Sequence, residues 1–431
     1  MILQEILLYI KNYIGEVQRK EFILNIKVNT EAINKKNIAV LYFLLNRYEN
    51  LYFITLEDMP YCIMADAIEH IIYQARPEKN YYHDTICRKC ELINKCPGWQ
   101  KYIPCDRKTV KPVKNMPKEI VLTITTDCAL NCKACQLDRR KIIDMDFETA
   151  KELLNEAKSL GIKRVRFTGG EPSLNRDIEK ILYHARKNKF YVIFNTNAVS
   201  LSVPLIKTLG DTVDNVLVSL QGFNQKTDAI LTGQDNLFYK KIGNLLKLKM
   251  KIPSLRVGTI ISKILLDNFE KYYLLLERIG IHDWDFYRPI VRNNLDEFKI
   301  SKKELRQVCK LIFTLKKRGM EAKIANPLPF CIIRNMPLAL STLSGAEADD
   351  GHSRLVWDTK GYFKPSYFIY EILGKNIKDA WYNPFLQKIR SLDFLPSKCR
   401  NCKYVKWCKG GSRAAAKLAK NNYFAKDPLL I

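Results

Sequence analysis

Two rhythms of hydrophobic residues alternate along the middle of the chain, from Glu119 to about residue 325. Short apolar runs are typical of buried strands, whereas apolar residues that recur every three or four positions are typical of amphipathic helices. The expected strands are Ile120–Thr125, Arg164–Phe167, Phe190–Asn195, Val216–Leu220, Leu255–Ile261 and Trp284–Tyr287. The expected helices include Phe147–Leu160, Arg176–Lys187, Leu237–Lys249, Asn268–Ile279 and Lys302–Lys317.

Six strand–helix repeats predict an α/β fold with a parallel sheet, and curling that sheet gives a partial (β/α)6 barrel. The active sites of such folds lie at the carboxyl ends of the strands. We therefore expect the functional side chains to come directly after the strands.

The segments on either side of this alternation have a different character. The first, residues 1–106, predicts a helix and then Glu21–Val28 (strand), Glu31–Tyr48 (helix) and Leu51–Thr55 (strand), followed by a cysteine-rich stretch. Residues 107–118 hold five basic residues, two prolines and no acid, which is typical of an extended linker. After the expected barrel at residues 119–325, residues 326–431 break the alternation and hold the last cysteines.

Hydrophobicity and charge restrict the class of protein to which this sequence can belong. No apolar run approaches the roughly 20 residues needed to span a bilayer, and Glu5, Lys11 and Glu16 interrupt the apolar start of the chain. The sequence thus predicts a cytoplasmic protein without a membrane partner. Lys and Arg outnumber Asp and Glu by 71 to 45, which favours acidic partners such as nucleic acid, an anionic cofactor or an acidic peptide. Evenly solvated lysines are the simpler explanation, because they occur in nearly every expected helix.

Thirteen cysteines change this picture, because clustered cysteines in a cytoplasmic chain indicate metal binding or catalysis rather than disulfides. Cys128, Cys132 and Cys135 directly follow the first expected barrel strand. Three thiolates on one loop hold three irons of a four-iron cluster and leave the fourth iron open. A structural zinc site wants four ligands, and neither a fourth cysteine nor a histidine accompanies this triplet.

This CxxxCxxC loop after the first strand of a six-fold β/α repeat resembles the radical S-adenosylmethionine (SAM) superfamily. The segment Thr168-Gly-Gly-Glu-Pro172 after the second strand is similar to the glycine-rich segment with which that family holds the amino group of SAM. The resemblance implies that SAM is bound by Gly169, Gly170, Glu171, Pro172, Asn195, Asn197, Ser219, Gln221 and Arg288. One position departs from the family, because an aromatic residue usually precedes the third cysteine and lies by the adenine, whereas this chain has Ala134.

The resemblance also implies a chemistry. A reduced [4Fe–4S] cluster gives one electron to SAM on its open iron, and SAM splits into methionine and a 5′-deoxyadenosyl radical that abstracts hydrogen from an unactivated C–H bond. A low-potential donor such as ferredoxin or flavodoxin supplies the electron. The protein's part is to position the target and to exclude quenchers.

The last cysteine group resembles the SPASM/twitch extension of many such enzymes. The similar stretch runs from about Asp358 to Leu418 and contains Cys399-x2-Cys402-x5-Cys408. A two-cluster extension has further cysteines where this chain has Ser366 and Ser412. The resemblance therefore implies one auxiliary [4Fe–4S] cluster, held by Cys331, Cys399, Cys402 and Cys408.

The N-terminal cysteines repeat the same ligand frame. Pro60-Tyr-Cys62-Ile echoes Pro329-Phe-Cys331-Ile, and Cys87-x2-Cys90-x5-Cys96 echoes the C-terminal spacing, although the gap between the two parts differs. We expect only the frame to repeat, and a second auxiliary cluster at Cys62, Cys87, Cys90 and Cys96. Four thiolates satisfy zinc as well as iron, so zinc stays open for both frames. Cys105 is expected to be free and Cys309 to be a buried core thiol.

These features favour a radical SAM enzyme that acts on a peptide or protein side chain, an α/β barrel flanked by N- and C-terminal cysteine-rich auxiliary cluster domains. A small-molecule or cofactor-pathway enzyme of the superfamily is an alternative. A tRNA-modifying enzyme ranks lower, because no RNA-binding motif is appended. A zinc-containing nucleic-acid-binding protein is the non-enzyme alternative, but it leaves the triplet at 128–135 and the Gly-Gly-Glu-Pro segment unexplained.

Overall fold

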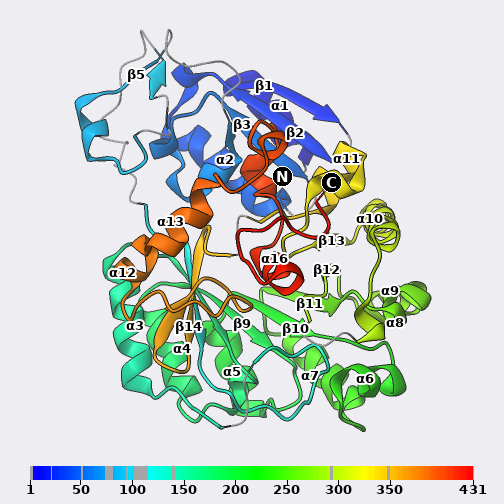
Figure 1. Cartoon of the computed structure of the whole chain (residues 1–431). Coiled ribbons are helices and arrows are strands. Elements are labelled where there is room, and N and C mark those ends of the chain that lie inside the picture. The colour runs from blue at the N-terminus through cyan, green and yellow to red at the C-terminus, as the bar shows by residue number, and fades with distance from the viewer. Residues whose placement is uncertain are drawn as a thin grey trace. The chain divides into compact units, whose positions relative to one another are not determined.

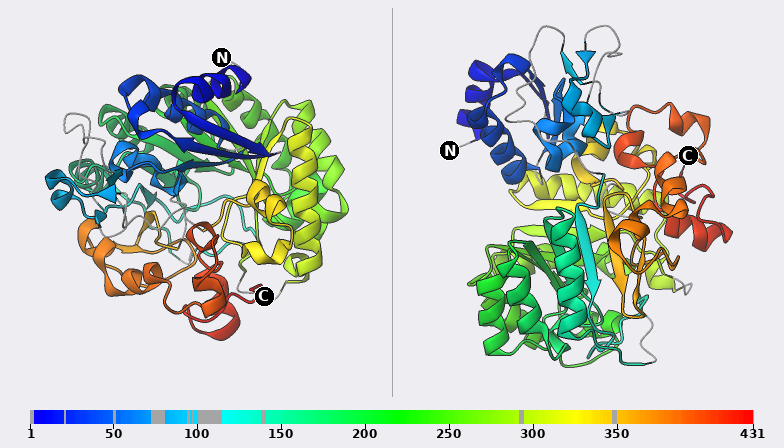
Figure 2. Two further views of the ribbon diagram at one scale, coloured as in Figure 1. Left: turned by 90° about the horizontal axis from the view of Figure 1, so that it is seen from above. Right: turned by 90° about the vertical axis from the view of Figure 1, so that its left-hand side faces the viewer.

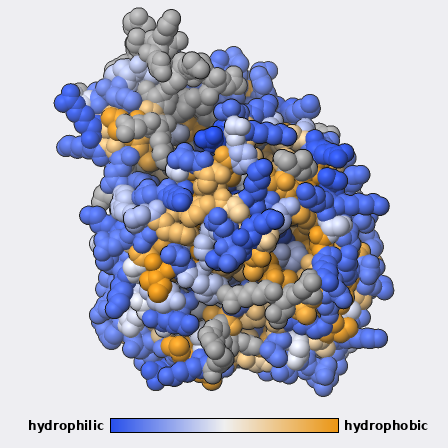
Figure 3. All heavy atoms as spheres, viewed as in Figure 1, coloured by the Kyte–Doolittle hydropathy of each residue, from blue (hydrophilic) through white to orange (hydrophobic). Residues whose placement is uncertain are grey.

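The computed structural model describes residues 3–20, 22–49, 52–72, 81–93, 96, 98–100, 115–137, 141–291, 295–346 and 350–430. The chain forms two compact units, Met1–Asn115 and Met116–Ile431. Cys105 and most of the expected linker at 107–118 lie outside the described residues. None of the described helices is long and apolar enough to cross a membrane. Hydrophilic residues cover most of the face seen in Figure 3.

The larger unit is built on a nine-stranded sheet with the order β13–β12–β11–β10–β9–β8–β7–β14–β15. Its strands are β7 (Glu119–Thr123), β8 (Arg164–Thr168), β9 (Tyr191–Thr196), β10 (Asn215–Ser219), β11 (Ser254–Ile260), β12 (Asp283–Tyr287), β13 (Glu321–Ile324), β14 (Arg354–Asp358) and β15 (Tyr362–Lys364). Neighbours from β13 to β14 pair in parallel, and β15 is antiparallel to β14. The predicted α/β fold with a parallel sheet is confirmed, and all six expected strands are present.

Helices cover one face of this sheet (Figure 1). They are α3 (Phe147–Ser159), α4 (Ile178–Lys187), α5 (Val203–Thr212), α6 (Gln225–Thr232), α7 (Phe238–Lys249), α8 (Lys263–Asp267), α9 (Phe269–Arg278) and α10 (Lys302–Lys317), with short 3-10 turns η7 (Pro172–Leu174) and η8 (Asp296–Phe298). Alternate strand residues explain the packing: Val165 and Phe167 of β8 are fully buried in the core against α3 and α4. Arg166, between them, points to the opposite face.

Residues 326–431 return to the same sheet, which the sequence did not indicate. Strand β14 pairs with β7 in parallel, with Leu355 beside Ile120, and the two strands lie side by side in Figure 2. The rest of this segment forms η9 (Phe330–Ile333), α11 (Met336–Thr342), α12 (Ile377–Tyr382), α13 (Pro384–Ser391), α14 (Ser397–Arg400), α15 (Val405–Cys408) and α16 (Arg413–Lys420). The segment that holds the last cysteine frame therefore also contributes strands β14 and β15 to the barrel sheet.

The smaller unit has its own four-stranded sheet, in the order β1–β2–β3–β4. Its elements are α1 (Leu3–Tyr13), β1 (Gly15–Lys20), β2 (Ile23–Val28), η1 (Thr30–Ala32), α2 (Lys35–Tyr48), β3 (Phe53–Glu57), η2 (Tyr61–Ile63), η3 (Ala65–His70), β4 (Ile71–Ile72), β5 (Tyr81–Tyr82), η5 (Thr85–Lys89) and β6 (Trp99–Gln100). Helix α2 begins later than expected, because Asn34 caps it by accepting a hydrogen bond from Asn37 N–H. Ile6 and Ile10 of α1 and Leu24 and Ile26 of β2 are fully buried in a separate core.

Candidate functional site

The loop after β7 carries the cysteine triplet. Cys128 Sγ accepts hydrogen bonds from Leu130 N–H at 3.4 Å and from Asn197 Nδ2 at 3.5 Å. Cys135 N–H donates to Cys132 O at 3.0 Å. Hydrogen bonds to ligand sulfurs stabilise thiolate charge and tune an iron–sulfur cluster. Cys128 thus receives one donor from its own loop and one from the end of β9, as suits a cluster ligand.

The end of α6 holds this loop in place. Asn131 N–H donates to Thr232 O at 2.9 Å, and Lys133 N–H donates to Leu231 O at 3.0 Å. Gly233 follows with φ +67°, and a Cβ at this position would lie 2.5 Å from Asn131 O. Only glycine combines this backbone conformation with so close an approach.

A buried ion pair lies near the same loop. Lys241 Nζ is 2.8 Å from Asp228 Oδ2, and the two side chains are 0% and 1% exposed. Asp228 Oδ1 also accepts a hydrogen bond from Gly222 N–H at 3.2 Å. Burial, ahead of repulsion from Cys135, raises the pKa of Cys132 to about 12, and Lys241 partly opposes the shift. A metal that binds Cys132 must therefore release a proton from the thiol.

Gly169 and Gly170 let the loop after β8 pack directly on the cysteine loop. Gly170 N–H donates to Thr125 O at 2.8 Å, and Glu171 N–H donates to Asp127 O at 2.7 Å. A Cβ at Gly169 would lie 2.4 Å from Thr125 O, and one at Gly170 would lie 2.2 Å from Asp127 O. The glycines were predicted from the approach of SAM, and the structure gives them a further reason, which is backbone contact with the cysteine loop.

We expect Gly170→Val to lose about four irons per chain after reconstitution, together with SAM binding. The new Cβ must displace Asp127, and with it the adjacent Cys128. Gly243→Val on α7 is a matched control, because nothing lies within 4 Å of a Cβ at that position. Iron and sulfide analysis, with SAM binding measured by equilibrium dialysis, checks the prediction. Full iron content in Gly170→Val would contradict it.

Glu171 braces the ends of β8 and β9. Its Oε1 accepts hydrogen bonds from Ser173 N–H (3.2 Å), Ser173 Oγ (2.8 Å) and Thr196 Oγ1 (2.7 Å), and its Oε2 accepts one from Asn197 N–H (2.7 Å). Burial raises the pKa of Glu171 above its usual range, although these hydrogen bonds act in the opposite direction. Glu171 therefore positions Asn197, the residue that bonds Cys128. A direct contact between Glu171 and SAM stays a prediction.

Four other predicted SAM contacts lie at neighbouring strand ends. Asn195 Oδ1 accepts a hydrogen bond from Arg166 Nη1 at 3.2 Å, and Gln221 Oε1 accepts one from Ile260 N–H at 3.1 Å. Ser219 ends β10, and Pro172 begins η7. Their positions at the carboxyl edge match the expected edge of the sheet, and their roles toward SAM stay predictions.

Arg288, directly after β12, forms a buried ion pair with the C-terminal segment. Its Nη1 and Nη2 donate to Asp427 Oδ2 and Oδ1 at 2.6 and 3.0 Å, and Nη1 also donates to Pro327 O at 3.2 Å. Asp427 Oδ2 further accepts a hydrogen bond from Ser412 N–H at 2.8 Å. The guanidinium thus links a strand end to the segment behind Cys408, and its contact with SAM stays a prediction.

The sheet face opposite the helices is polar. Arg166 Nε and Nη2 donate to Glu119 Oε1 and Oε2 at 2.8 and 3.2 Å, and Arg256 pairs with the buried Asp285. Burial alone would raise the pKa of Glu119, but Arg166 and Arg354 hold it at about 2. The charged side chains on this face are thus paired with one another.

The C-terminal cysteines lie within electrostatic range of one another. Burial raises the pKa of Cys399, and the neighbouring Cys331 and Cys402 thiolates raise it further. Burial also raises the pKa of Cys408 to about 11, and Cys331 and Cys399 add to the effect. Several thiols packed together favour their protonated forms until a metal neutralises them.

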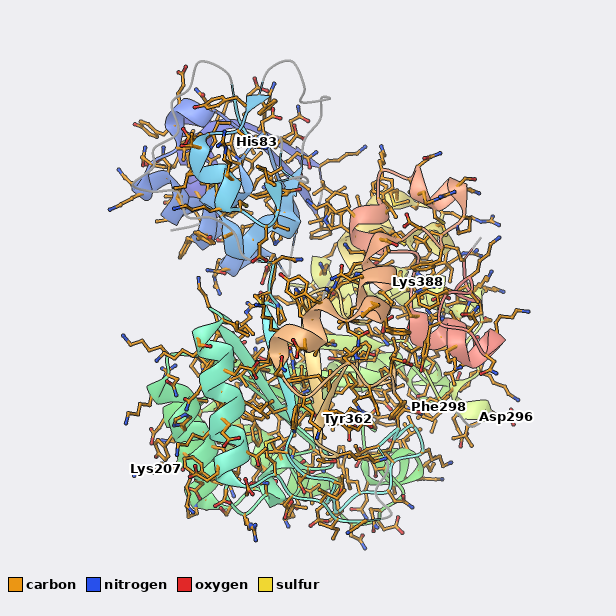
Figure 4. The ribbon with its side chains drawn as sticks, turned by 60° about the vertical axis from the view of Figure 1, so that its left-hand side comes forward. His83, Lys207, Asp296, Phe298, Tyr362 and Lys388 are labelled. Atoms are coloured by element: carbon orange, nitrogen blue, oxygen red, sulfur yellow. The ribbon has the colours of Figure 1, made fainter. Side chains whose placement is uncertain are left out.

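The N-terminal cysteines Cys62, Cys87, Cys90 and Cys96 line one pocket that opens to solvent. Tyr61, His83 and Trp99 line it too. His83 is labelled in Figure 4, and its Nε2 lies 2.7 Å from Cys96 O. The frame predicted from spacing therefore surrounds a single space. His83 was not foreseen at this site, because no second histidine accompanies it in the sequence.

Each of the three cysteine groups presents a backbone N–H to a sulfur. Leu130 N–H donates to Cys128 Sγ, Gly98 N–H to Cys96 Sγ and Phe330 N–H to Cys408 Sγ, each at 3.4 Å. Neutral thiols are weak acceptors, whereas metal-bound thiolates take such bonds readily. Such a donor suits an iron-bound or a zinc-bound thiolate alike, and among the described residues no three of these side chains are already arranged around a metal position.

The two four-cysteine frames share more than ligand spacing, because the same order of elements precedes each isolated cysteine, although the chain between that cysteine and the grouped ones differs. Parallel strands joined by a helix precede each isolated cysteine: β2–α2–β3 before Cys62, and β12–α10–β13 before Cys331. Each of these cysteines lies on a 3-10 turn capped by a proline, Pro60 or Pro329. The βαβ pattern before each Pro-aromatic-Cys motif was the signal that could have revealed the repeat.

The serines at the two missing cysteine positions have structural partners. Ser366 and Ser412 are both fully buried. Ser366 Oγ accepts a hydrogen bond from Phe368 N–H at 3.3 Å, and Ser412 Oγ caps α16 by accepting one from Ala415 N–H at 3.3 Å. Cys309 on α10 is fully buried in the core.

Comparison with known sequences points to one family. Residues 122–241 match the family model described as the Radical SAM superfamily. The AdoMet-dependent heme synthase of Methanosarcina barkeri is 23% identical over 343 residues, which cover 74% of this chain and 97% of that protein. The PqqA peptide cyclase of Bradyrhizobium diazoefficiens is 30% identical over 132 residues, 30% of this chain and 34% of that protein. The chain thus spans only about a third of the length of that cyclase.

Solved structures share the fold. Streptococcus suis SuiB bound to precursor peptide SuiA has a TM-score of 0.60 at 18% identity, covering 73% of this chain and 76% of that one. The anSMEcpe structure with bound AdoMet has a TM-score of 0.56 at 17% identity, covering 71% of this chain and 93% of that one. The family match, together with the cysteine triplet packed on the Gly-Gly-Glu-Pro segment, identifies residues 122–241 as a radical SAM domain.

Proposed function

We propose that this chain is an enzyme that cleaves SAM reductively and acts on the side chain of a peptide or protein. The proposal rests on the hydrogen bonds that join the cysteine loop to the Gly169–Glu171 segment and to Asn197. When bound, a [4Fe–4S] cluster and SAM together supply a radical that abstracts hydrogen. Cys128, Cys132 and Cys135 would supply the thiolate ligands of that cluster, and Glu171 links the ends of β8 and β9 through hydrogen bonds from Thr196 and Asn197.

Two relatives in fold and sequence support a peptide substrate. SuiB was solved with a precursor peptide, and the PqqA cyclase is named for its peptide.

A small-molecule substrate is the second candidate, because the match to the heme synthase extends over 97% of that protein. The test is an anaerobic incubation of reconstituted protein with dithionite and SAM, with short peptides encoded beside its gene or with tetrapyrrole precursors added separately. Faster 5′-deoxyadenosine formation and a mass change in a peptide would support the first candidate. A mass change in the tetrapyrrole alone would support the second.

We further propose that both four-cysteine frames hold auxiliary [4Fe–4S] clusters. The reconstituted protein is then expected to contain about twelve irons per chain. Removing Cys399, Cys402 and Cys408 should leave about eight, and metal analysis by mass spectrometry provides the count. About four irons with stoichiometric zinc would mean that the frames are zinc sites.

A further inference from the structure

One line of side chains on the outer surface of α7 is apolar. Helix α7 packs against α5 and α6 in the layer of helices that covers the barrel sheet (Figure 1), and Leu245 and Leu248 on its inner face are fully buried. Three side chains on its opposite face are exposed: Tyr239 (71%), Leu246 (41%) and Met250 (84%), the last being the C-cap residue with helical backbone angles. Spacings of seven and four residues place these three on one line, which we call the α7 stripe. The outward face of a solvated helix normally carries polar residues, and a line of apolar ones is typical of an interaction surface.

Gly243 makes a notch in the α7 stripe. It lies four residues after Tyr239 and three before Leu246, and nothing in the described part of the chain lies within 4 Å of a Cβ built on it. Glycine inside a helix costs about 1 kcal/mol relative to alanine, and here neither a positive φ nor a contact within the described chain requires it. The notch lets a large side chain from another helix come close to the backbone of α7.

The surface around the α7 stripe is basic. A lysine directly follows each of its three exposed residues, and α7 contains no acidic residue. On α7, its two packed neighbours α5 and α6, and the adjoining residues 233–237, 250 and 251, the exposed charges are six lysines and two aspartates: Lys207, Lys226, Lys240, Lys247, Lys249, Lys251, Asp211 and Asp235. Lys240 and Lys247 lie seven residues apart on one side of the stripe, and no described carboxylate forms an ion pair with either. These two ammonium groups are therefore available to a partner.

We propose that the α7 stripe is the docking site for a helix of a partner protein, one that presents an apolar seam flanked by Asp and Glu. The seam covers the three exposed apolar side chains, and a large apolar residue of the partner fills the notch at Gly243. Acidic residues seven positions apart on the partner helix meet Lys240 and Lys247. Burial of apolar surface drives such an association, and opposite charges orient the two helices. The docking site is independent of the reaction proposed for the barrel.

Charge and shape disfavour three other occupants of the stripe. A second copy of α7 would bring lysines against lysines in either orientation, because the helix has no acid. The longest segment outside the described residues, 101–114, has five Lys and Arg and one Asp, so its charge is not complementary either. An anionic membrane surface would attract the lysines but would gain nothing from a notch at Gly243. An acidic helix accounts for the exposed apolar line, the notch and the lysines together.

The test begins with photo-cross-linking of the full chain in the cells that naturally make it. The photoreactive amino acid p-benzoylphenylalanine is placed at position 239, and in a matched control at position 183, where Tyr183 of α4 is also exposed (50%). Mass spectrometry then maps the segment joined to each position. We expect position 239, and not position 183, to join a segment with apolar residues at helical spacing and acidic residues seven positions apart. The absence of an adduct at position 239 would overturn the proposal, as would an adduct only with lipid, with a second copy of this chain or with a segment that lacks acidic residues.

A synthetic peptide of the mapped segment then serves as the probe, with its Kd measured by calorimetry at low and high salt. Lys240→Glu/Lys247→Glu should raise the Kd about tenfold at low salt and much less at high salt. Gly243→Leu should raise it about tenfold at both salt concentrations, because the new side chain fills the notch. Lys303→Glu/Lys310→Glu on α10, a pair with the same spacing, is the control and should leave the Kd unchanged.

Iron content and dithionite-driven SAM cleavage should stay at the wild-type level in all of these variants, because α7's outward face belongs to none of the cysteine groups. An unchanged Kd in both Lys240→Glu/Lys247→Glu and Gly243→Leu would overturn the docking site. Wild-type protein that fails to cleave SAM with dithionite would instead overturn the proposed function and leave the docking result standing.

Discussion

Replacing Cys128, Cys132 and Cys135 together by Ala is expected to abolish the formation of 5′-deoxyadenosine and methionine from SAM. The three thiolates are the protein ligands of the proposed open cluster, and the closed four-cysteine frames offer SAM no vacant iron. The loss should therefore be complete, because the remaining clusters cannot substitute for the missing site. The measurement is chromatographic analysis of an anaerobic incubation with dithionite.

Cys309→Ala is the matched control for this experiment. Cys309 is fully buried on α10 and belongs to none of the three groups, so its loss should cost roughly 1 kcal/mol of stability and no iron. The triple variant is expected to keep about eight irons. That iron content would separate loss of one cluster from misfolding. Product formation by a triple variant that holds those irons would contradict the assignment of the triplet.

The sequence predicted the six central barrel strands well, because each is a short run between helical segments that is either apolar or, in β8 and β12, alternates large apolar with charged residues. It missed β13 and β14 for physical reasons. Strand β13 has only four residues, and Ile324 is its one large apolar side chain beside the charged Glu321 and Lys323, so it looks like exposed chain. Strand β14 joins the sheet beside β7, with Arg354 opposite Glu119. A pairing between segments so far apart leaves no trace in the local pattern.

The residues of the candidate site also fall into two sets, those that a local sequence pattern indicates and those that only the fold brings together. Cysteine spacing is local within each run, so the runs 87–96, 128–135 and 399–408 stand out in the sequence. Cys62 and Cys331 are joined to their runs only by the repeated Pro-aromatic-Cys-Ile motif, and metal binding by all three groups stays a prediction. The bond between Asn197 and Cys128 joins residues 69 positions apart, and the ion pair of Arg288 with Asp427 joins residues 139 apart. The hydrogen bonds of Glu171 to Thr196 and Asn197 and the ion pair of Arg288 with Asp427 could not be inferred from motifs. Each depends on which loops meet after folding.

The buried ion pair near the triplet leads to the second large effect. Lys241→Met leaves the Asp228 carboxyl, 1% exposed, without its ammonium partner. Leaving one buried charge uncompensated costs about 3–5 kcal/mol. We expect the free energy of unfolding of the metal-free protein to fall by about this amount, as measured by urea titration.

A second variant separates the effect of charge from that of packing. Adding Asp228→Asn to Lys241→Met removes the orphaned charge and keeps an oxygen that can accept the Gly222 N–H. The double variant should therefore recover most of the lost stability, and a double-mutant cycle gives the coupling. Helix α6 also binds the backbone of Asn131 and Lys133, so Lys241→Met should hold less iron at the triplet while about eight irons remain in the other frames. A single variant as stable as the wild type would mean that this pair does not brace the cysteine loop.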